Sequence, residues 1–137
     1  MKDSLLAGLT IVQRHDIDKA RTIGFMGEEN RVYGTPNLLY DIEIACRDLL
    51  LEHSDEGEDS VGTHVELTHS GATLLGMWVE ITVELAAVNG RAVDFEVTAR
   101  DALEQVASCK HSRFVVDVNK TAERLQGKLA KAQAADS

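Results

Sequence analysis

The most constraining feature of this 137-residue sequence is a hairpin pattern in its second half. Between residues 77 and 87, apolar residues at odd positions alternate with mainly polar residues, as in a strand with one buried face. An Asn-Gly pair at 89–90 is typical of a tight hairpin turn, and residues 93–99 continue the inward phase at odd positions. The chain must therefore build an antiparallel sheet whose apolar face another element covers.

The element that can cover this face is a helix predicted from Pro36 to about Glu52. Thr35 is a favourable N-cap residue, and Pro36, the only proline, suits the first helical position. On a helical wheel the apolar residues form one broad face, with Asp41, Asp48 and Glu52 placed opposite. That face consists of Leu38, Leu39, Ile42, Ala45, Cys46, Leu49 and Leu50. We expect this helix to be largely buried.

Further strands are predicted on both sides of the helix. A first strand is expected near residues 5–12, and a glycine-rich, charged loop over residues 24–34. The stretch 61–76 predicts a strand, a turn and the start of the next strand. The last strand runs from about Gln105 to Asp117, where poorer alternation indicates a bulge or an edge position. The acidic segment 53–60 is expected to be a solvated connection.

Together these elements predict one α+β domain spanning residues 1–137. The expected architecture is the hotdog fold, in which an antiparallel β-sheet, here with four of its strands in a meander, wraps around one long central α-helix. An α+β sandwich with another strand order fits the same elements. The tail 119–137 is rich in Ala, Lys and Gln, so we expect a short terminal helix that frays, and we assign it no function.

Charge and cysteine content restrict the partners and the compartment. With 14 Lys and Arg against 23 Asp and Glu, the net charge is −9, which disfavours nucleic acid and anionic membranes. An anionic ligand would need a local basic patch. Cys46 and Cys109 have no metal-type spacing and are expected to be reduced thiols. No signal peptide and no apolar run of roughly 20 residues is present, so we expect a cytoplasmic protein.

His69 is unusual because period-two alternation places it on the face shared by Val61, Val65 and Leu67. A histidine at a strand end is often half-exposed, with its ring nitrogens satisfied by backbone or water. His64 lies five positions earlier, on the opposite face, so the two do not predict a metal site.

Three more residues have both a structural and a functional interpretation. Glu43 borders the apolar helix face, where it either pairs with Arg47 one turn later or is a desolvated carboxylate suited to proton transfer or nucleophilic attack. The amides beside Thr35 at the helix start suit developing negative charge. Gly62 either relieves crowding in a strand or lets a ligand approach the backbone.

The segments "GTPNLLYDIEIAC" and "VGTHVELTHSGATLLG" resemble fluoroacetyl-CoA thioesterase and its relatives among the hotdog thioesterases. The shared pattern is a Thr just before the central helix, a Glu eight residues later, a Gly-Thr opening the next strand, and a His seven residues after that Gly. Here these are Thr35, Glu43, Gly62 and His69. The likeness extends more loosely from the first strand, through the "NGR" hairpin, to the last strand.

The resemblance implies an enzyme that hydrolyses an acyl-CoA thioester at sites between the subunits of a homodimer. His69 would act as general acid and base, Glu43 would attack the carbonyl or activate water, and Thr35 would position the carbonyl or the attacking group. No metal or cofactor is implied, because CoA is part of the substrate. Edge strands that need cover support the dimer, and a tetramer of two such dimers is the open alternative.

The acyl pocket that the resemblance implies would include Gly62, Thr63 and Tyr33. Fluoroacetyl-specific members carry a gating phenylalanine six residues before the threonine, where this chain has Glu29 in an ungapped alignment. Tyr33, Val32 or Phe25 could cover the pocket instead.

The CoA phosphates could be met by Lys110, His111 and Arg113 of the last strand or by Arg47, although each of these is expected to be a solvated surface charge. Two other functions remain open. One is a non-catalytic protein that binds acyl-CoA or another acyl ligand. The other is a hydratase, which is disfavoured because its Asp/His arrangement has no clear counterpart here.

Overall fold

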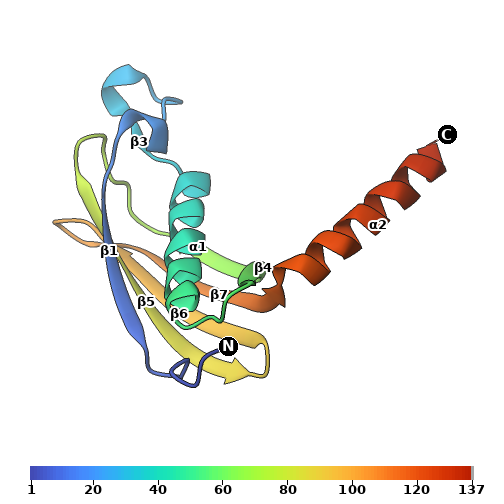
Figure 1. The fold of residues 1–137 in the computed structure, drawn as a ribbon. Helices are drawn as coiled ribbons and strands as arrows, with labels where there is room; N and C mark the ends of the chain where they lie inside the picture. The colour runs from blue at the N-terminus through green and yellow to red at the C-terminus, as the bar shows by residue number, and fades with distance from the viewer. Residues whose placement is uncertain (137) are drawn as a thin grey trace.

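The computed structural model describes residues 1–136, and Figure 1 shows one sheet curved around one helix, with a second helix projecting from it. The elements, in chain order, are β1 (Thr10–Asp16), η1 (Lys19–Arg21), β2 (Thr22–Ile23), η2 (Glu28–Asn30), β3 (Val32–Tyr33), α1 (Thr35–Glu52), β4 (Glu58–His69), β5 (Trp78–Asn89), β6 (Ala92–Arg100), β7 (Gln105–Asp117) and α2 (Val118–Asp136). The α+β hotdog arrangement predicted above is confirmed.

The main sheet is antiparallel and has the strand order β1-β5-β6-β7-β4. The hairpin β5–β6 turns at Gly90, as predicted, with a φ of +62° that favours glycine. The predicted turn from β4 directly into β5 is wrong. β4 pairs with β7 along its length, and the link 70–77 carries the chain across to β5 on the other side of the sheet. β1 and β4 are therefore the edge strands.

Hydrogen bonds hold this link against three other segments. Ser70 N donates to Val106 O, Tyr33 N donates to Thr73 O, and Gly76 N donates to Ile17 O. These long-range bonds replace a local hairpin, which is why the nearby Ser-Gly pair did not predict the pairing correctly.

The core lies between α1 and the concave face of the sheet. On β5 and β6 the residues predicted to point inward are buried, from Val79 to Leu85 and from Val93 to Ala99. The predicted apolar residues of α1 are also buried, except Leu39, which is half-buried. One helix prediction is wrong. Asp41 was placed on the exposed face but is only 5% exposed.

Two predicted boundaries also change. β1 begins at Thr10 instead of Leu5, because Gly8 has a φ of +99° and interrupts the extended chain. The acidic segment 53–60 is not all solvated connection, since β4 begins at Glu58. Arg91 pairs with Glu58 and Arg47 pairs with Asp59, which keeps these carboxylates in an ordered strand.

A register shift between Gly62 and His64 bends β4 near its middle. Ser60 faces the core before the shift, while Val65, Leu67 and His69 face it afterwards. Val61 is 45% exposed, so the prediction that it shares a face with His69 is wrong. The extra residue reverses the alternation.

β7 lies between β6 and β4, so the predicted edge position is wrong. A register shift does occur where β7 begins, opposite Ala99 and Arg100. Cys46 and Cys109 are both free and buried, as expected for reduced thiols.

The C-terminal helix α2 is longer than predicted and has no buried residue. It leaves the sheet beside the start of β4 and extends away from the body, as the red helix in Figure 1 shows. Within residues 1–136, neither helix is both long and apolar enough to span a membrane.

Candidate functional site

Thr35 and His69 meet at the start of α1. Gly34, not Thr35, occupies the N-cap position, so the predicted capping role of Thr35 is wrong. Thr35 is the first residue of the helix, and its Oγ1 lies 2.8 Å from Nδ1 of His69, within a hydrogen bond. The hydroxyl is therefore coupled to an imidazole that can exchange its proton.

The surroundings of His69 favour its neutral form. Burial lowers the pKa of His69 below its usual value, and the nearby backbone of Gly71 offsets this decrease only in part. The buried Nε2 atom of His69 has no hydrogen-bond partner among residues 1–136. The edge of the Tyr33 ring faces the imidazole, with ring centroids 6.4 Å apart and planes at 79°. A neutral imidazole can accept a proton at pH 7.

Tyr33 was predicted to border an acyl pocket. In the structure its ring lies beside the ring of His69. Its hydroxyl donates to Oδ2 of Asp41 at 2.5 Å, and Arg21 Nε donates to the same oxygen at 2.9 Å. Burial and the Asp41 carboxylate both raise the pKa of Tyr33, so the phenol stays protonated. This network fixes the ring that lies behind His69.

Sequence reasoning missed Asp41 and Arg21. The signal for Asp41 was available, because it lies three residues after Leu38 and four before Ala45, on the buried side of the helix. A carboxylate at such a position needs a partner in the core. No comparable signal identified Arg21 as that partner.

A second polar group lies farther along α1, where Glu43 faces Gly62 of β4. A Cβ added to Gly62 would be 2.9 Å from Glu43 Oε1 and 3.2 Å from His111 Cε1. The missing side chain therefore lets the Glu43 carboxylate approach the β4 backbone. Thr63 follows in the bulge and is exposed at the edge.

Arg113 and His111 complete this second group. Arg113 donates from Nε to Ser60 Oγ at 2.8 Å and from Nη1 to His111 Nε2 at 3.2 Å. His111 Nδ1 donates to the carbonyl of His64 at 2.7 Å, which fixes the ring tautomer. Burial lowers the pKa of both side chains.

The prediction that His111 and Arg113 are solvated surface charges is wrong, since they are 1% and 5% exposed. Their odd numbers place them in the inward phase of β7, and this was the signal that sequence reasoning passed over. Arg47 pairs with Asp59 at 2.7 Å, so the alternative pair with Glu43 is also wrong.

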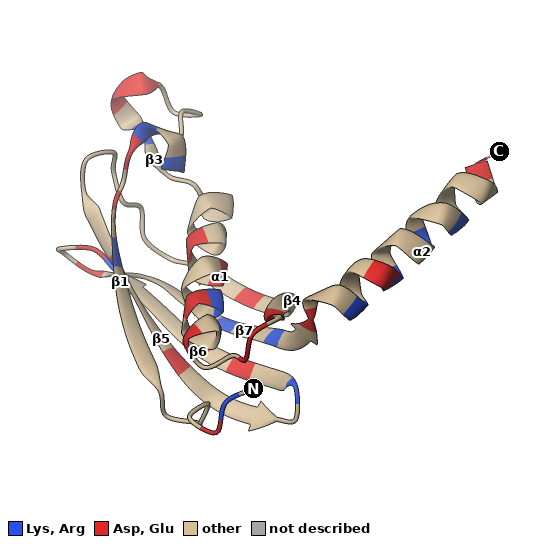
Figure 2. Cartoon of the chain, viewed as in Figure 1, with Lys and Arg blue, Asp and Glu red and all other residues tan. Residues whose placement is uncertain are grey.

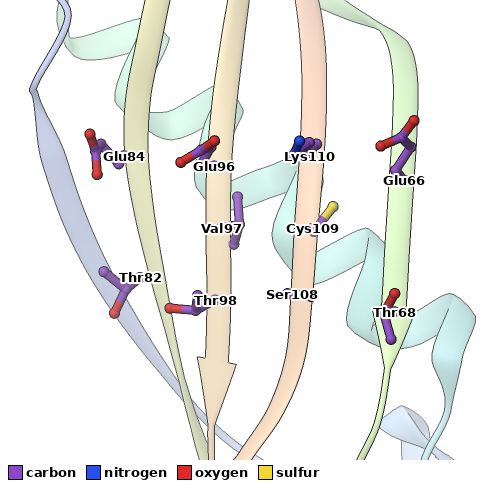
Figure 3. A pocket seen from close by; sticks show the side chains of 10 residues that line it. All are labelled: Glu66, Thr68, Thr82, Glu84, Glu96, Val97, Thr98, Ser108, Cys109 and Lys110. Carbon is purple, nitrogen blue, oxygen red and sulfur yellow. The ribbon is translucent and has the colours of Figure 1, made fainter.

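Lys110 faces the opposite side of the sheet from α1. Figure 3 shows it there between Glu96 and Glu66, in a row that continues to Glu84. These residues line an open hollow of about 420 Å³ on the outer face, together with Thr68, Thr82, Thr98 and Ser108. Because the sheet separates this hollow from Thr35 and His69, it is not part of their site.

The two polar groups are well separated within one chain. Eight helical residues from Thr35 to Glu43 correspond to about 12 Å. Seven strand residues from Gly62 to His69 correspond to about 23 Å. One chain thus carries two separate polar groups, Thr35–His69 and Glu43–Gly62, hereafter called half-sites, and both include residues of the edge strand β4. Within residues 1–136, no three His, Cys, Asp or Glu side chains are arranged to hold a metal ion.

Comparison with known proteins identifies relatives over most of the chain. Residues 17–119 match the model of the fluoroacetyl-CoA-specific thioesterase family. The fluoroacetyl-CoA thioesterase of Streptantibioticus cattleyicolor is 28% identical over 127 residues, covering 88% of this chain and 91% of the relative.

Solved structures give the same result. A mutant of the fluoroacetyl-CoA-specific thioesterase FlK, in complex with fluoroacetate and CoA, has a TM-score of 0.79 at 27% identity, covering 85% of this chain and 99% of its own. A thioesterase-superfamily protein of Thermus thermophilus has a TM-score of 0.85 at 24% identity, covering 97% and 98%, and shows the shared fold.

Proposed function

This chain belongs to the fluoroacetyl-CoA-specific thioesterase family, and we propose that it hydrolyses the thioester of a short or compact acyl-CoA to the free acid and CoA. The observation that carries the proposal is the 2.8 Å contact between Thr35 Oγ1 and His69 Nδ1. A hydroxyl, a neutral imidazole and a carboxylate are the groups that such a hydrolysis needs.

In the proposed reaction, an oxygen nucleophile bonds to the acyl carbon and the carbon–sulfur bond breaks. Glu43 either attacks the carbonyl itself, which gives an anhydride that water then hydrolyses, or activates the attacking water by accepting a hydrogen bond from it. His69 is neutral at rest, so it accepts the proton that the attacking water releases and passes it to the leaving sulfur. Thr35 donates a hydrogen bond that orients the carbonyl or the attacking group. Water provides the oxygen of the released acid, so no cofactor is required.

We propose that the complete site forms between two subunits. The 12 Å offset along α1 keeps Glu43 away from Thr35 of its own chain. β4 has a free edge on which a second β4 can pair antiparallel. Pairing around Val65 and Glu66 would set Gly62 opposite the partner subunit's His69. A C2 dimer of this kind contains two identical sites.

The acyl-pocket residues follow from this pairing. Gly62 and Thr63 lie at the edge where the second subunit would join, so their backbone would border the acyl group. The hydrogen bond to Asp41 fixes the Tyr33 ring beside His69. Tyr33 would therefore shape the pocket by holding His69 in place. A cytoplasmic location agrees with an acyl-CoA substrate.

The direct test measures CoA release from a panel of acyl-CoA esters. We expect turnover by the wild type and its loss in Glu43→Ala and His69→Ala. Matched controls are Glu96→Ala on the outer face of β6 and His53→Ala, whose ring bonds to Ser4 Oγ at the far end of α1 from Thr35. Binding of the esters without thiol release would instead support a non-catalytic binding protein. Unchanged turnover in both site variants would refute the assigned roles.

A further inference from the structure

The positive charges of the body are mostly engaged with carboxylates. Ion pairs join Arg14 to Glu80, Lys19 to Glu28, Arg21 to Asp41, Arg31 to Glu28, Arg47 to Asp59 and Arg91 to Glu58. Arg113 is buried between α1 and the sheet. In a chain of net charge −9, few cations of the body remain for an anionic ligand.

Helix α2 differs because its cations are unpaired. Lys120, Arg124, Lys128 and Lys131 lie on one side of the helix, within about 80° of the wheel. Within residues 1–136, none of them forms an ion pair, and the Arg124 guanidinium bonds only to Thr121 Oγ1 at 3.3 Å. The blue segments along α2 in Figure 2 show this concentration of positive charge beyond the body.

The root of α2 borders a hollow of about 350 Å³. Arg91, Lys120 and Arg124 line it, together with the carboxylates of Asp117 and Glu123. Phe114 also lines the hollow, and this residue is 42% exposed. Cations beside an exposed aromatic ring form the chemistry that binds a nucleotide, with phosphates on the cations and the base stacked on the ring.

This hollow lies within reach of the second half-site. Asp117 pairs with Glu58 at the start of β4, four residues before Gly62. Four strand residues correspond to about 13 Å, which an extended pantetheine arm can bridge. Phe114 has the outward phase of β7 and Glu43 lies on the α1 side, so the arm of one CoA molecule would pass around the end of the sheet at Asp117 to join the hollow to the Glu43–Gly62 half-site.

We propose that the hollow at the root of α2 binds the adenosine phosphate end of CoA. Lys120 and Arg124 contact the phosphates, and Phe114 stacks on the adenine. This inference rests on the proposed function for its choice of ligand. It assigns a binding role to the terminal helix, which projects from the fold without packing against it.

The test compares CoA with pantetheine, which lacks the nucleotide and its phosphates, by calorimetric titration. In Lys120→Gln/Arg124→Gln we expect the Kd for CoA to rise at least about tenfold, because charge-assisted hydrogen bonds are lost. The Kd for pantetheine should not change. Lys128→Gln/Lys131→Gln is the matched control, since it removes the same charge from the same helix but leaves the hollow intact.

Two results would overturn the inference. One is an unchanged Kd for CoA in Lys120→Gln/Arg124→Gln. The other is an equal increase in this Kd in both double variants, which would indicate a general electrostatic attraction and not a binding site. Thiol release from an acyl N-acetylcysteamine thioester, which has no phosphates, tests the proposed function separately. If the wild type released no thiol from this ester, hydrolysis would be refuted. The CoA titrations would still decide whether the hollow binds the nucleotide.

Discussion

At the scale of single residues, the Thr35 hydroxyl is free for chemistry because Gly34 occupies the cap position of α1. In Thr35→Val the contact with His69 is lost, and we expect kcat to fall by about 10²-fold or more. The melting temperature should change little, since the side chain is exposed and caps nothing. Thr35→Ser should keep most of the activity. Equal loss in Thr35→Ser and Thr35→Val would contradict a role for the hydroxyl.

His69 predicts the pH dependence of the reaction. Burial lowers its pKa, so the ring remains neutral to a lower pH than an ordinary histidine. A base of this kind is active when unprotonated, and kcat/KM should therefore fall on the acid side with a midpoint below about 6.5. A pH–rate profile of the wild type measures this. An acid limb centred above that value would be inconsistent with the neutral imidazole.

Gly62 is predicted to be required for space and not for backbone conformation. A Cβ there would lie 2.9 Å from Glu43 Oε1, and the φ angle of Gly62 is not positive. In Gly62→Ala the flexible carboxylate must move and the buried His111 ring, 3.2 Å from the added Cβ, must shift slightly, so we expect a lower kcat with a small decrease in the melting temperature. Gly127→Ala, where an added Cβ meets nothing within 4 Å, is the control. Wild-type kcat in Gly62→Ala would argue against a close approach of Glu43.

At the scale of elements, the segment between Gly24 and Gly34 is the one that we expect to cover the acyl group. It contains η2 and β3, with Glu29 exposed on η2 and Phe25 87% exposed. No aromatic ring occupies position 29 to gate the pocket. We therefore expect the kcat/KM values for fluoroacetyl-CoA and acetyl-CoA to agree within about tenfold, because the two substrates differ by a single small substituent. A much larger preference for the fluorinated ester would show that another residue provides the gate.

Local patterns predicted most of the elements but not their pairing. The α1 boundaries followed from Pro36 and a repeating apolar face, and the β5–β6 hairpin followed from alternation around Asn-Gly. The pairing of β4 with β7 depends on contacts between residues far apart in sequence. No local pattern encodes such contacts, so the chain was expected to turn directly from β4 into β5.

The candidate site shows the same limit at the level of side chains. Its four residues were found from spacing and resemblance, and the structure brings Thr35 to His69 and Glu43 to Gly62. The bulge in β4 was not predicted, because one extra residue changes the phase without changing the composition. The partners of buried charges, such as Arg21 for Asp41, depend on tertiary packing and were missed for that reason.

At the scale of the whole molecule, the distance between the two half-sites of one chain is the reason to propose a site shared between subunits. Thr35 and His69 lie at one end of α1, and Glu43 and Gly62 lie about 12 Å along it. The free edge of β4 runs past both. Two copies paired along this edge would complete two sites, each with one half from each subunit.

The most direct test of this claim mixes His69→Ala and Glu43→Ala subunits, unfolded together and refolded, and measures CoA release. Each variant alone breaks both of its sites. A mixed dimer would contain one site with both residues intact, so a statistical mixture should recover about a quarter of the wild-type activity. Activity no greater than that of the two separate variants would contradict a site shared between subunits.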